Sequence, residues 1–302
     1  MVCYRLFLWG VATAALAIGS GCTKQESVVE VARGSGFEVR FDGTVMGTTW
    51  SAVVADTHDD SAKLIARVGD AVHGVDARMS TYKPDSEISR FGTGPANTPH
   101  EVSADTYMVV EDALRIAAKT GGAFDPTIMP LVDLWGFGPA PTPETAPSAE
   151  AIAAAMESCG YQKVSMIEGN EMWALSKSVA ALRVDLSAIA KGHGVDAMAL
   201  AVEERGAQNY LVEIGGELRG KGVSQDGSPW LVGIDAPRME EGPGRPLQAA
   251  VELHDQAIAT SGNYRNYRNH THLTTSLIAA GGAAAAGRAG GRREVCGRTT
   301  GK

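Results

Sequence analysis

The sequence has little that would stabilise a protein through special chemistry. Its 302 residues include only four cysteines, and the two in the body of the chain, Cys159 and Cys296, are far apart. Two distant thiols are not a disulfide framework, so stability must come from a hydrophobic core. Basic residues are in deficit, since the formal net charge is −8. No basic field is available to attract nucleic acid, and we expect no nucleic-acid partner.

The sequence also lacks a hydrophobic run of comfortable membrane-spanning length. Its longest apolar stretch, residues 6–18, follows Arg5 and precedes the small residues 19–21. This order is typical of a secretory signal peptide, which we expect over residues 1–21. Cys22 resembles the lipidated cysteine of a bacterial lipoprotein, although glycine stands at residue 19 where leucine is usual. Acyl chains on Cys22 would hold the protein at a membrane, and simple secretion is the alternative.

The rest of the chain predicts an α+β domain. Residues 22–36 are polar and unpatterned, as expected of a tether. Helical spacing and capping residues predict helices over residues 61–79, 103–119, 148–160 and from about 187 to 206. Alternating apolar residues predict strands within residues 37–54, 163–166, 181–186, 209–222, 229–235 and 247–262. Because helices and strands do not alternate strictly, a doubly wound sheet is disfavoured.

The C-terminal segment departs from this pattern. Residues 279–302 contain seven alanines, seven glycines and four arginines. Such a composition cannot bury enough apolar surface to fold, so we expect residues 269–302 to form an aberrant tail without stable structure.

Several segments carry candidate ligand-binding residues. Met46 lies between glycines and offers flexible apolar surface to a flat ring, although an ordinary hairpin explains the same residues. Tyr82 precedes a proline and is expected on a loop, where it would stack on a ligand or cover a helix end. Residues 121–137 hold two prolines, aromatic side chains and Asp125, which favours a structured binding loop without a helix or strand.

A polar segment, "DLSAIAKGHGVD" at residues 185–196, begins the last predicted helix. Asp185 and Ser187 are candidate N-caps, while Lys191 with the adjacent glycines suits an anion site at a helix N-terminus. The segment is neither a Walker A loop nor a dinucleotide fingerprint. His193 has no second ligand at metal spacing, so we assign it a structural role.

Together these motifs resemble the ApbE-type FAD:protein FMN transferases. The segments "MGTTW", "MSTYKPDSEISRF", "GGAFDPTIMPLVDLWGF", "VDLSAIAKGHGVD", "LVEIGGE" and "AIATSGNYRNY" occur in that family's order within residues 37–268. The resemblance implies an ApbE-like α+β fold of two related sub-parts with a ligand pocket between them. It also implies a lipid-anchored enzyme on the periplasmic side of the bacterial inner membrane. Its partners would be target flavoprotein subunits of membrane electron-transport complexes.

The implied reaction splits FAD with Mg²⁺, attaches FMN to a threonine or serine hydroxyl of the target, and releases AMP. The resemblance carries FAD contacts to seven positions, namely Met46, Tyr82, Ala123, Phe124, Asp125, Asp185 and Lys191. Ala188 would offer its backbone carbonyl to Mg²⁺, a cation that prefers oxygen ligands. Phosphoryl transfer needs positioning and charge neutralisation, which these residue types suit.

The resemblance fails after Tyr267. The family continues with a His-Ile-Ile-Asp-Pro segment and a helix that supplies side-chain metal ligands, and neither is present in this sequence. A shifted reading frame permits His-Ile-Ile-Asp near Thr274. We therefore hypothesise a frameshift between Tyr267 and Thr274. Loss of those ligands would impair transfer, so a lipoprotein that only binds FAD and a flavoprotein assembly factor remain alternatives.

Overall fold

The structure of this chain is a computed structural model, which describes residues 27–33, 36–57, 59–169, 172–236, 247–261, 268–270, 273–275 and 295–299. The expected signal peptide and the Cys22 lipidation site lie outside these residues, as do Tyr267 and residues 271–272 of the proposed frameshift region between Tyr267 and Thr274. Within the described ranges, no helix is long and apolar enough to cross a membrane. The chain divides into two compact units: unit 1 is Met1–Gly74, Lys191–Ser261 and Arg293–Lys302, and unit 2 is Val75–Ala190 and Gly262–Arg292.

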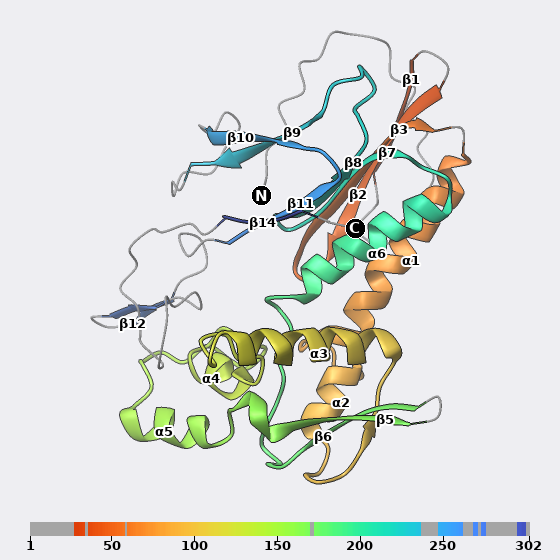
Figure 1. Cartoon of the computed structure of the whole chain (residues 1–302). Helices are drawn as coiled ribbons and strands as arrows, with labels where there is room; N and C mark the ends of the chain where they lie inside the picture. Colours follow the sequence, from red (N-terminus) through yellow and green to blue (C-terminus); the bar gives the residue numbers. More distant parts are fainter. Residues whose placement is uncertain are drawn as a thin grey trace, which may run out of the picture. The chain divides into compact units, whose positions relative to one another are not determined.

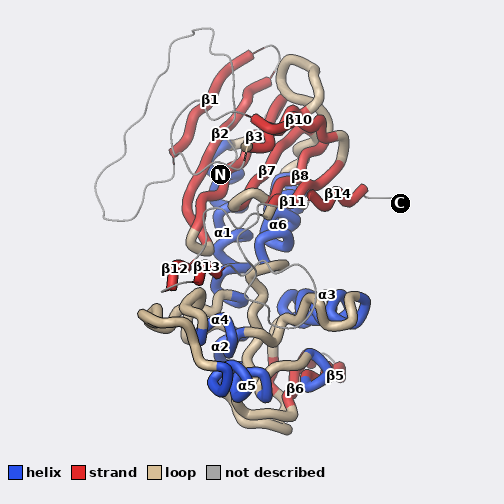
Figure 2. The backbone as a smooth tube through the Cα atoms, turned by 90° about the vertical axis from the view of Figure 1, so that its left-hand side faces the viewer, coloured by secondary structure: helices blue, strands red, loops and turns tan. Residues whose placement is uncertain are grey.

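Unit 1 is built on an antiparallel sheet of seven strands in the order β1-β2-β3-β7-β8-β11-β14 (Figures 1 and 2). The strands are β1 (Ser27–Arg33), β2 (Gly36–Val45), β3 (Thr48–Thr57), β7 (Asn209–Ile214), β8 (Glu217–Lys221), β11 (Gln256–Thr260) and β14 (Val295–Thr299). Neighbours in the chain pair as hairpins at β2–β3 and at β7–β8, whereas β3 pairs with β7 across a long sequence separation.

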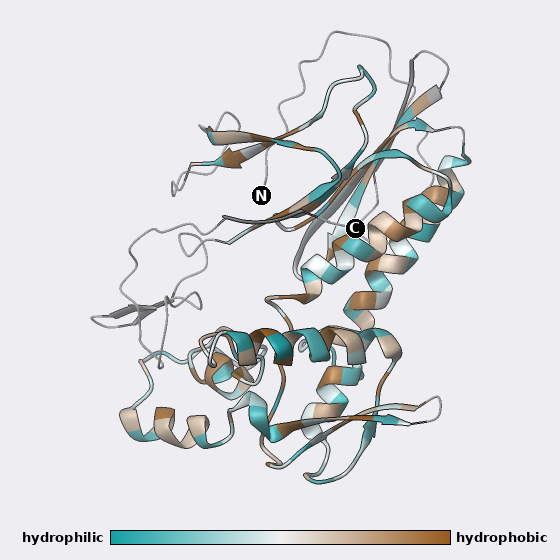
Figure 3. Cartoon of the chain, in the orientation of Figure 1, coloured by the Kyte–Doolittle hydropathy of each residue, from teal (hydrophilic) through white to brown (hydrophobic). Residues whose placement is uncertain are grey.

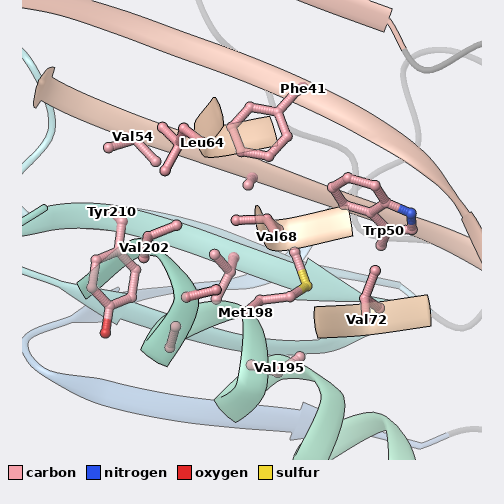
Figure 4. Close-up of a cluster of buried hydrophobic side chains, with 14 of the residues drawn as sticks. Phe41, Trp50, Val54, Leu64, Val68, Val72, Val195, Met198, Val202 and Tyr210 are labelled. Atoms are coloured by element: carbon pink, nitrogen blue, oxygen red, sulfur yellow. The ribbon is translucent and has the colours of Figure 1, made fainter. Parts of the chain in front are cut away.

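Two helices cover one face of this sheet. They are α1 (Ser61–Met79), whose residues up to Gly74 belong to unit 1, and α6 (Ala190–Glu204). The core that they form with β2, β3 and β7 is drawn in Figure 4 and contains Phe41, Trp50, Val54, Leu64, Val68, Val72, Val195, Met198, Val202 and Tyr210. In Figure 3 both helices carry hydrophobic and hydrophilic residues, as expected of helices with one buried face.

The other face of the sheet is covered by a two-stranded antiparallel sheet, β9 (Trp230–Asp235) and β10 (Leu247–Leu253). Trp230, Val232 and Leu253 pack there against Ala55 and Leu211. Since strand side chains alternate, β3 contributes Trp50, Ala52 and Val54 to the helix side and Val53 and Ala55 to this side. The sheet is therefore buried on both faces along β3 and β7, which fixes their register.

Unit 2 combines short helices with a three-stranded antiparallel sheet in the order β4-β6-β5. Its elements are α2 (Glu87–Thr93), β4 (His100–Glu101), α3 (Ala104–Lys119), α4 (Met129–Leu134), α5 (Ala149–Glu157), the 3₁₀ helix η1 (Tyr161–Lys163), β5 (Val164–Gly169), β6 (Met172–Lys177) and, among residues 262–292, β12 (Arg268–His270) and β13 (Leu273–Thr275). Ser103 caps α3 by accepting a hydrogen bond from the Thr106 amide, and Ser148 caps α5 in the same way.

A buried lysine joins three segments of unit 2. Lys177 is 1% exposed, and its Nζ donates hydrogen bonds to the carbonyls of Gly92 at 2.6 Å, Ala180 at 2.8 Å and Leu182 at 2.9 Å. The ammonium also lies 5.4 Å from the centre of the Phe91 ring. Burial lowers the pKa of Lys177. The side chain thus holds the end of α2 and the chain after β6 in one place.

The α+β fold class is confirmed, as are the helices at residues 61–79 and 103–119, the hairpins of unit 1 and the loop position of Tyr82. The strand predicted at residues 181–186 is wrong, because that segment forms only an isolated bridge between Arg183 and Ile128. The prediction that the loop at residues 121–137 contains no helix is wrong, because the loop contains α4. Pro130 is tolerated there because it lies in the first turn, where a backbone amide has no partner within the helix. Within the expected tail, Leu273–Thr275 and Val295–Thr299 are strands.

Candidate functional site

In unit 1 the candidate residue Met46 forms a two-residue turn with Gly47 between β2 and β3. Val45 pairs with Thr48, and both turn residues have positive φ, 50° for Met46 and 72° for Gly47. Two positive φ values match the right-handed twist of a hairpin, and glycine or asparagine usually occupies such positions. Met46 is half-buried and packs against the helix-side core. The hairpin interpretation is therefore correct, and the methionine adopts a backbone conformation that is unusual for its type.

The first turn of α6 and the β7–β8 turn lie beside Met46. A Cβ added at Gly194 would approach Ile214 Cδ1 to 2.8 Å and Met46 Cε to 3.6 Å, so α6 packs closely against both side chains at this glycine. Lys191, in the first turn of α6, forms an ion pair with Glu217 at 2.6 Å and donates a hydrogen bond to the Gly215 carbonyl at 3.3 Å. The β2–β3 turn with Met46 and the β7–β8 turn contacted by Lys191 thus both lie against the N-terminal part of α6.

The β7–β8 turn is itself firmly held. Gly215 and Gly216 have φ values of 55° and 103°, which favour glycine. The Gly215 amide bonds to the Thr49 carbonyl at 3.1 Å, and the Gly216 carbonyl accepts hydrogen bonds from the Thr260 amide and hydroxyl. Strands β3 and β11 therefore hold the turn whose carbonyl Lys191 contacts.

Two carboxylates flank this turn in a desolvated environment. Glu213 is 6% exposed and accepts a hydrogen bond from the Gly216 amide at 2.8 Å. Burial raises the pKa of Glu213, and the neighbouring Glu217 raises it further. Burial also raises the pKa of Glu217, against the opposing effect of Lys191. The surroundings of the turn therefore stabilise the charged form of both carboxylates less well than water does.

Replacement of Glu213 by glutamine is expected to change the pH dependence of stability. With a native pKa above the unfolded value, the folded state binds more protons, so wild-type stability falls as pH rises from about 4.5 through the native pKa. The glutamine does not titrate, and its amide oxygen can still accept a hydrogen bond from Gly216. Melting curves from pH 4 to 8 should show the variant gaining stability relative to wild type as pH rises. A constant difference across that range would contradict the expectation.

In unit 2 the candidate Asp125 is engaged by its own loop. Its Oδ1 accepts hydrogen bonds from the Thr127 amide at 2.8 Å and hydroxyl at 2.6 Å, and its Oδ2 accepts from the Tyr161 amide at 3.0 Å. Thr127 is fully buried, and its hydroxyl also accepts from the Gly160 amide at 2.6 Å. Asp125 and Thr127 therefore fix the loop that carries Ala123 and Phe124 to the start of η1.

Replacement of Thr127 by valine is expected to lower the free energy of unfolding by about 2 kcal/mol, because the buried Gly160 amide loses its acceptor and Asp125 loses a donor. The valine has nearly the same shape, so packing is preserved. Thr127→Ser keeps the hydroxyl and should restore most of the loss. Urea denaturation of the three proteins measures both effects, and equal stabilities for the valine and serine variants would refute the role of the hydroxyl.

The segment before α6 lies beside the same loop. The Asp185 amide bonds to the Pro126 carbonyl at 2.7 Å, which places the backbones of the two predicted acidic ligands side by side. Asp185 Oδ1 accepts hydrogen bonds from the amide and hydroxyl of Ser187. An ion pair of 2.6 Å between Arg183 and Asp133 ties this segment to α4. The helix begins at Ala190, so Ser187 lies three residues before it.

Tyr82 and Ala188 are the exposed candidates of unit 2. The Tyr82 ring is 65% exposed, and its hydroxyl donates to the Phe137 carbonyl at 3.1 Å, which fixes the ring while leaving its surface accessible. Ala188 is exposed in the turn before α6. In the part of the chain that the structure describes, no group of three or more His, Cys, Asp or Glu residues is placed to hold a metal. These residues therefore do not form a complete Mg²⁺ ligand set around Ala188.

The structure thus distributes the predicted ligands over both units. Met46 and Lys191 belong to unit 1, and Tyr82, Ala123, Phe124, Asp125, Asp185 and Ala188 belong to unit 2. The sequence interpretation missed the roles of Glu217 and Thr127. Glu217 was within a motif noted for its glycines, and a carboxylate directly after a two-glycine turn was the available signal.

Comparison with known proteins identifies relatives over most of the chain. The ApbE family model matches residues 46–280, a range that contains all eight of these positions. The FAD:protein FMN transferase of Vibrio cholerae is 41% identical over 261 residues, covering 86% of this chain and 73% of that protein. The one from Haemophilus influenzae is 38% identical over 263 residues, covering 85% and 72%.

Solved structures give the same result. The flavin transferase ApbE from Vibrio cholerae matches with a TM-score of 0.69 and 37% identity, over 83% of this chain and 76% of that one. The apo form of the flavinyl transferase ApbE from Pseudomonas stutzeri matches with a TM-score of 0.69 and 34% identity, over 85% and 75%. With a family match over most of its length and relatives of this similarity, the chain belongs to the ApbE family of transferase enzymes.

Proposed function

We propose that this chain transfers FMN from FAD to a threonine or serine hydroxyl of a target flavoprotein. The observation that carries the proposal is the family match through every predicted FAD contact, with relatives named as FAD:protein FMN transferases. In the reaction the target oxygen bonds to the FMN phosphorus and the bond between the two FAD phosphates breaks. AMP leaves with the electrons of that bond, and the hydroxyl proton is released.

The residues of the chain suit binding and positioning more than covalent chemistry. Lys191 is the predicted group for the diphosphate, because its ammonium is held at a helix start by Glu217 and the Gly215 carbonyl. The accessible ring of Tyr82 and the fixed loop around Phe124 are suited to flat aromatic ligands. Positioning and electrostatic stabilisation are the main contributions that a protein makes to phosphoryl transfer.

Mg²⁺ dependence, lipid anchoring and the periplasmic location are further parts of the proposal. Their support is the resemblance of the sequence motifs, the apolar segment before Cys22 and the exposed carbonyl-bearing turn at Ala188. The proposed partners are flavoprotein subunits of membrane electron-transport complexes.

Incubation of the full chain with FAD, MgCl₂ and such a flavoprotein subunit tests the proposal. We expect covalent flavin on the subunit, seen as in-gel fluorescence, together with one AMP for each flavin attached. A matched reaction with EDTA should lose both signals. FAD retained without transfer or AMP would instead identify a protein that only binds FAD, and no flavin binding at all would refute both functions.

A further inference from the structure

Helix α6 and strand β8 are joined by four ion pairs along their length, of which Glu203 with Arg219 at 3.8 Å is the longest. Lys191 pairs with Glu217 at 2.6 Å, Asp196 with Arg219 at 2.8 Å, and Glu203 with Lys221 at 3.2 Å. The alternating residues of β8 that point toward α6 therefore all carry charge, while Leu218 between them points into the opposite core. The simplest explanation is that all four pairs only attach the helix to the sheet.

The first pair differs from the second in its surroundings. The side chain of Glu217 is 16% exposed, whereas that of Asp196 is 56% exposed. A buried carboxylate holds its partner more strongly than an exposed one, since water screens it less. In addition, the Lys191 ammonium contacts the Gly215 carbonyl, in a turn that β3 and β11 hold in place. Glu217 and this turn therefore restrict an ammonium that would otherwise move on a flexible side chain.

We propose that Glu217 is a positioning residue for Lys191, which holds the lysine ammonium where the diphosphate of a flavin nucleotide is to bind. The inference rests on the proposed function, because Lys191 is the predicted diphosphate contact. A lysine ammonium that is already fixed in place would not have to be ordered when the ligand binds, which lowers the free-energy cost of binding. Burial raises the pKa of Glu217, as expected of a carboxylate that is largely shielded from water.

A double-mutant cycle tests whether Glu217 acts through Lys191. The variants are Glu217→Gln, Lys191→Met and the double variant, and Asp196→Asn is the matched control because it removes the carboxylate of the neighbouring pair. Two quantities are measured for each protein: kcat/KM for FAD in the transfer assay, and the Kd for FAD from flavin fluorescence. Thermal unfolding of each variant reports separately on attachment of the helix.

We expect Glu217→Gln to lower kcat/KM for FAD and to weaken FAD binding, each by about tenfold, a coupling typical of contacting residues. In the Lys191→Met background the same substitution should cause no further loss, and Asp196→Asn should leave both quantities near wild type. Equal losses in both backgrounds, or no loss or tighter FAD binding in the wild-type background, would each overturn the inference. A wild-type protein without FAD binding or transfer would instead refute the proposed function itself.

Discussion

Lys191→Met is expected to reduce FMN transfer by a factor of about one hundred to one thousand, the range seen when one preorganised donor is removed from a site of developing charge. The substitution keeps the length of the side chain but removes the ammonium that contacts the β7–β8 turn. It also leaves the half-buried Glu217 carboxylate without its cation, which adds repulsion toward a diphosphate. Initial rates of target flavinylation at several FAD concentrations measure the effect.

Lys221→Met is the matched control for this prediction. Lys221 is also a lysine that pairs with α6, through Glu203, and its side chain is 34% exposed compared with 29% for Lys191. We expect the control to retain transfer within about twofold, because Lys221 is not a predicted FAD contact and a charge acts on the reaction only where charge develops. Comparable losses in the two variants would mean that Lys191 only attaches α6 to the sheet.

Lys177→Met is expected to lower the free energy of unfolding by about 3 kcal/mol, the largest effect on stability that we anticipate for a single residue. The variant leaves the carbonyls of Gly92, Ala180 and Leu182 without their shared donor inside unit 2. Each unsatisfied buried group costs about 1–3 kcal/mol, and relief from burying an ammonium offsets part of this sum. Urea denaturation followed by circular dichroism measures the change.

Lys163→Met supplies the comparison for Lys177. The Lys163 ammonium also donates to two carbonyls, those of Glu157 at 2.6 Å and Cys159 at 2.7 Å, but in a more exposed setting where water can replace it. We expect a loss below about 1 kcal/mol for this variant. Losses of similar size at both positions would show that burial is not what makes Lys177 important.

The helices that were predicted well are those whose signals are local. The apolar spacing of α1 and the serine cap of α3 depend only on residues within each helix, so the sequence was sufficient. Residues 181–186 alternate like a strand, but a strand needs a partner, and only Arg183 forms a bridge there. Partners come from distant segments, which a local pattern cannot reveal.

The same distinction applies to the candidate site. Met46 and Tyr82 were proposed from glycine, proline and aromatic residues close by, and their turn positions are confirmed. The Lys191–Glu217 pair depends on the register of β7 with β8 and on how α6 packs over them. The contacts of Thr127 with Gly160 and of Asp185 with Pro126 likewise depend on long-range packing, so the sequence could not predict them.

The turn at Met46 has a consequence for how this enzyme responds to selection for thermostability. Its left-handed backbone disfavours any side chain with a Cβ by about 1–2 kcal/mol relative to glycine. A library screened only for heat resistance would therefore favour glycine at residue 46, and would discard the thioether that lies beside Gly194. At residue 46 we therefore expect the side chain that gives the highest stability to differ from the one that gives the highest activity.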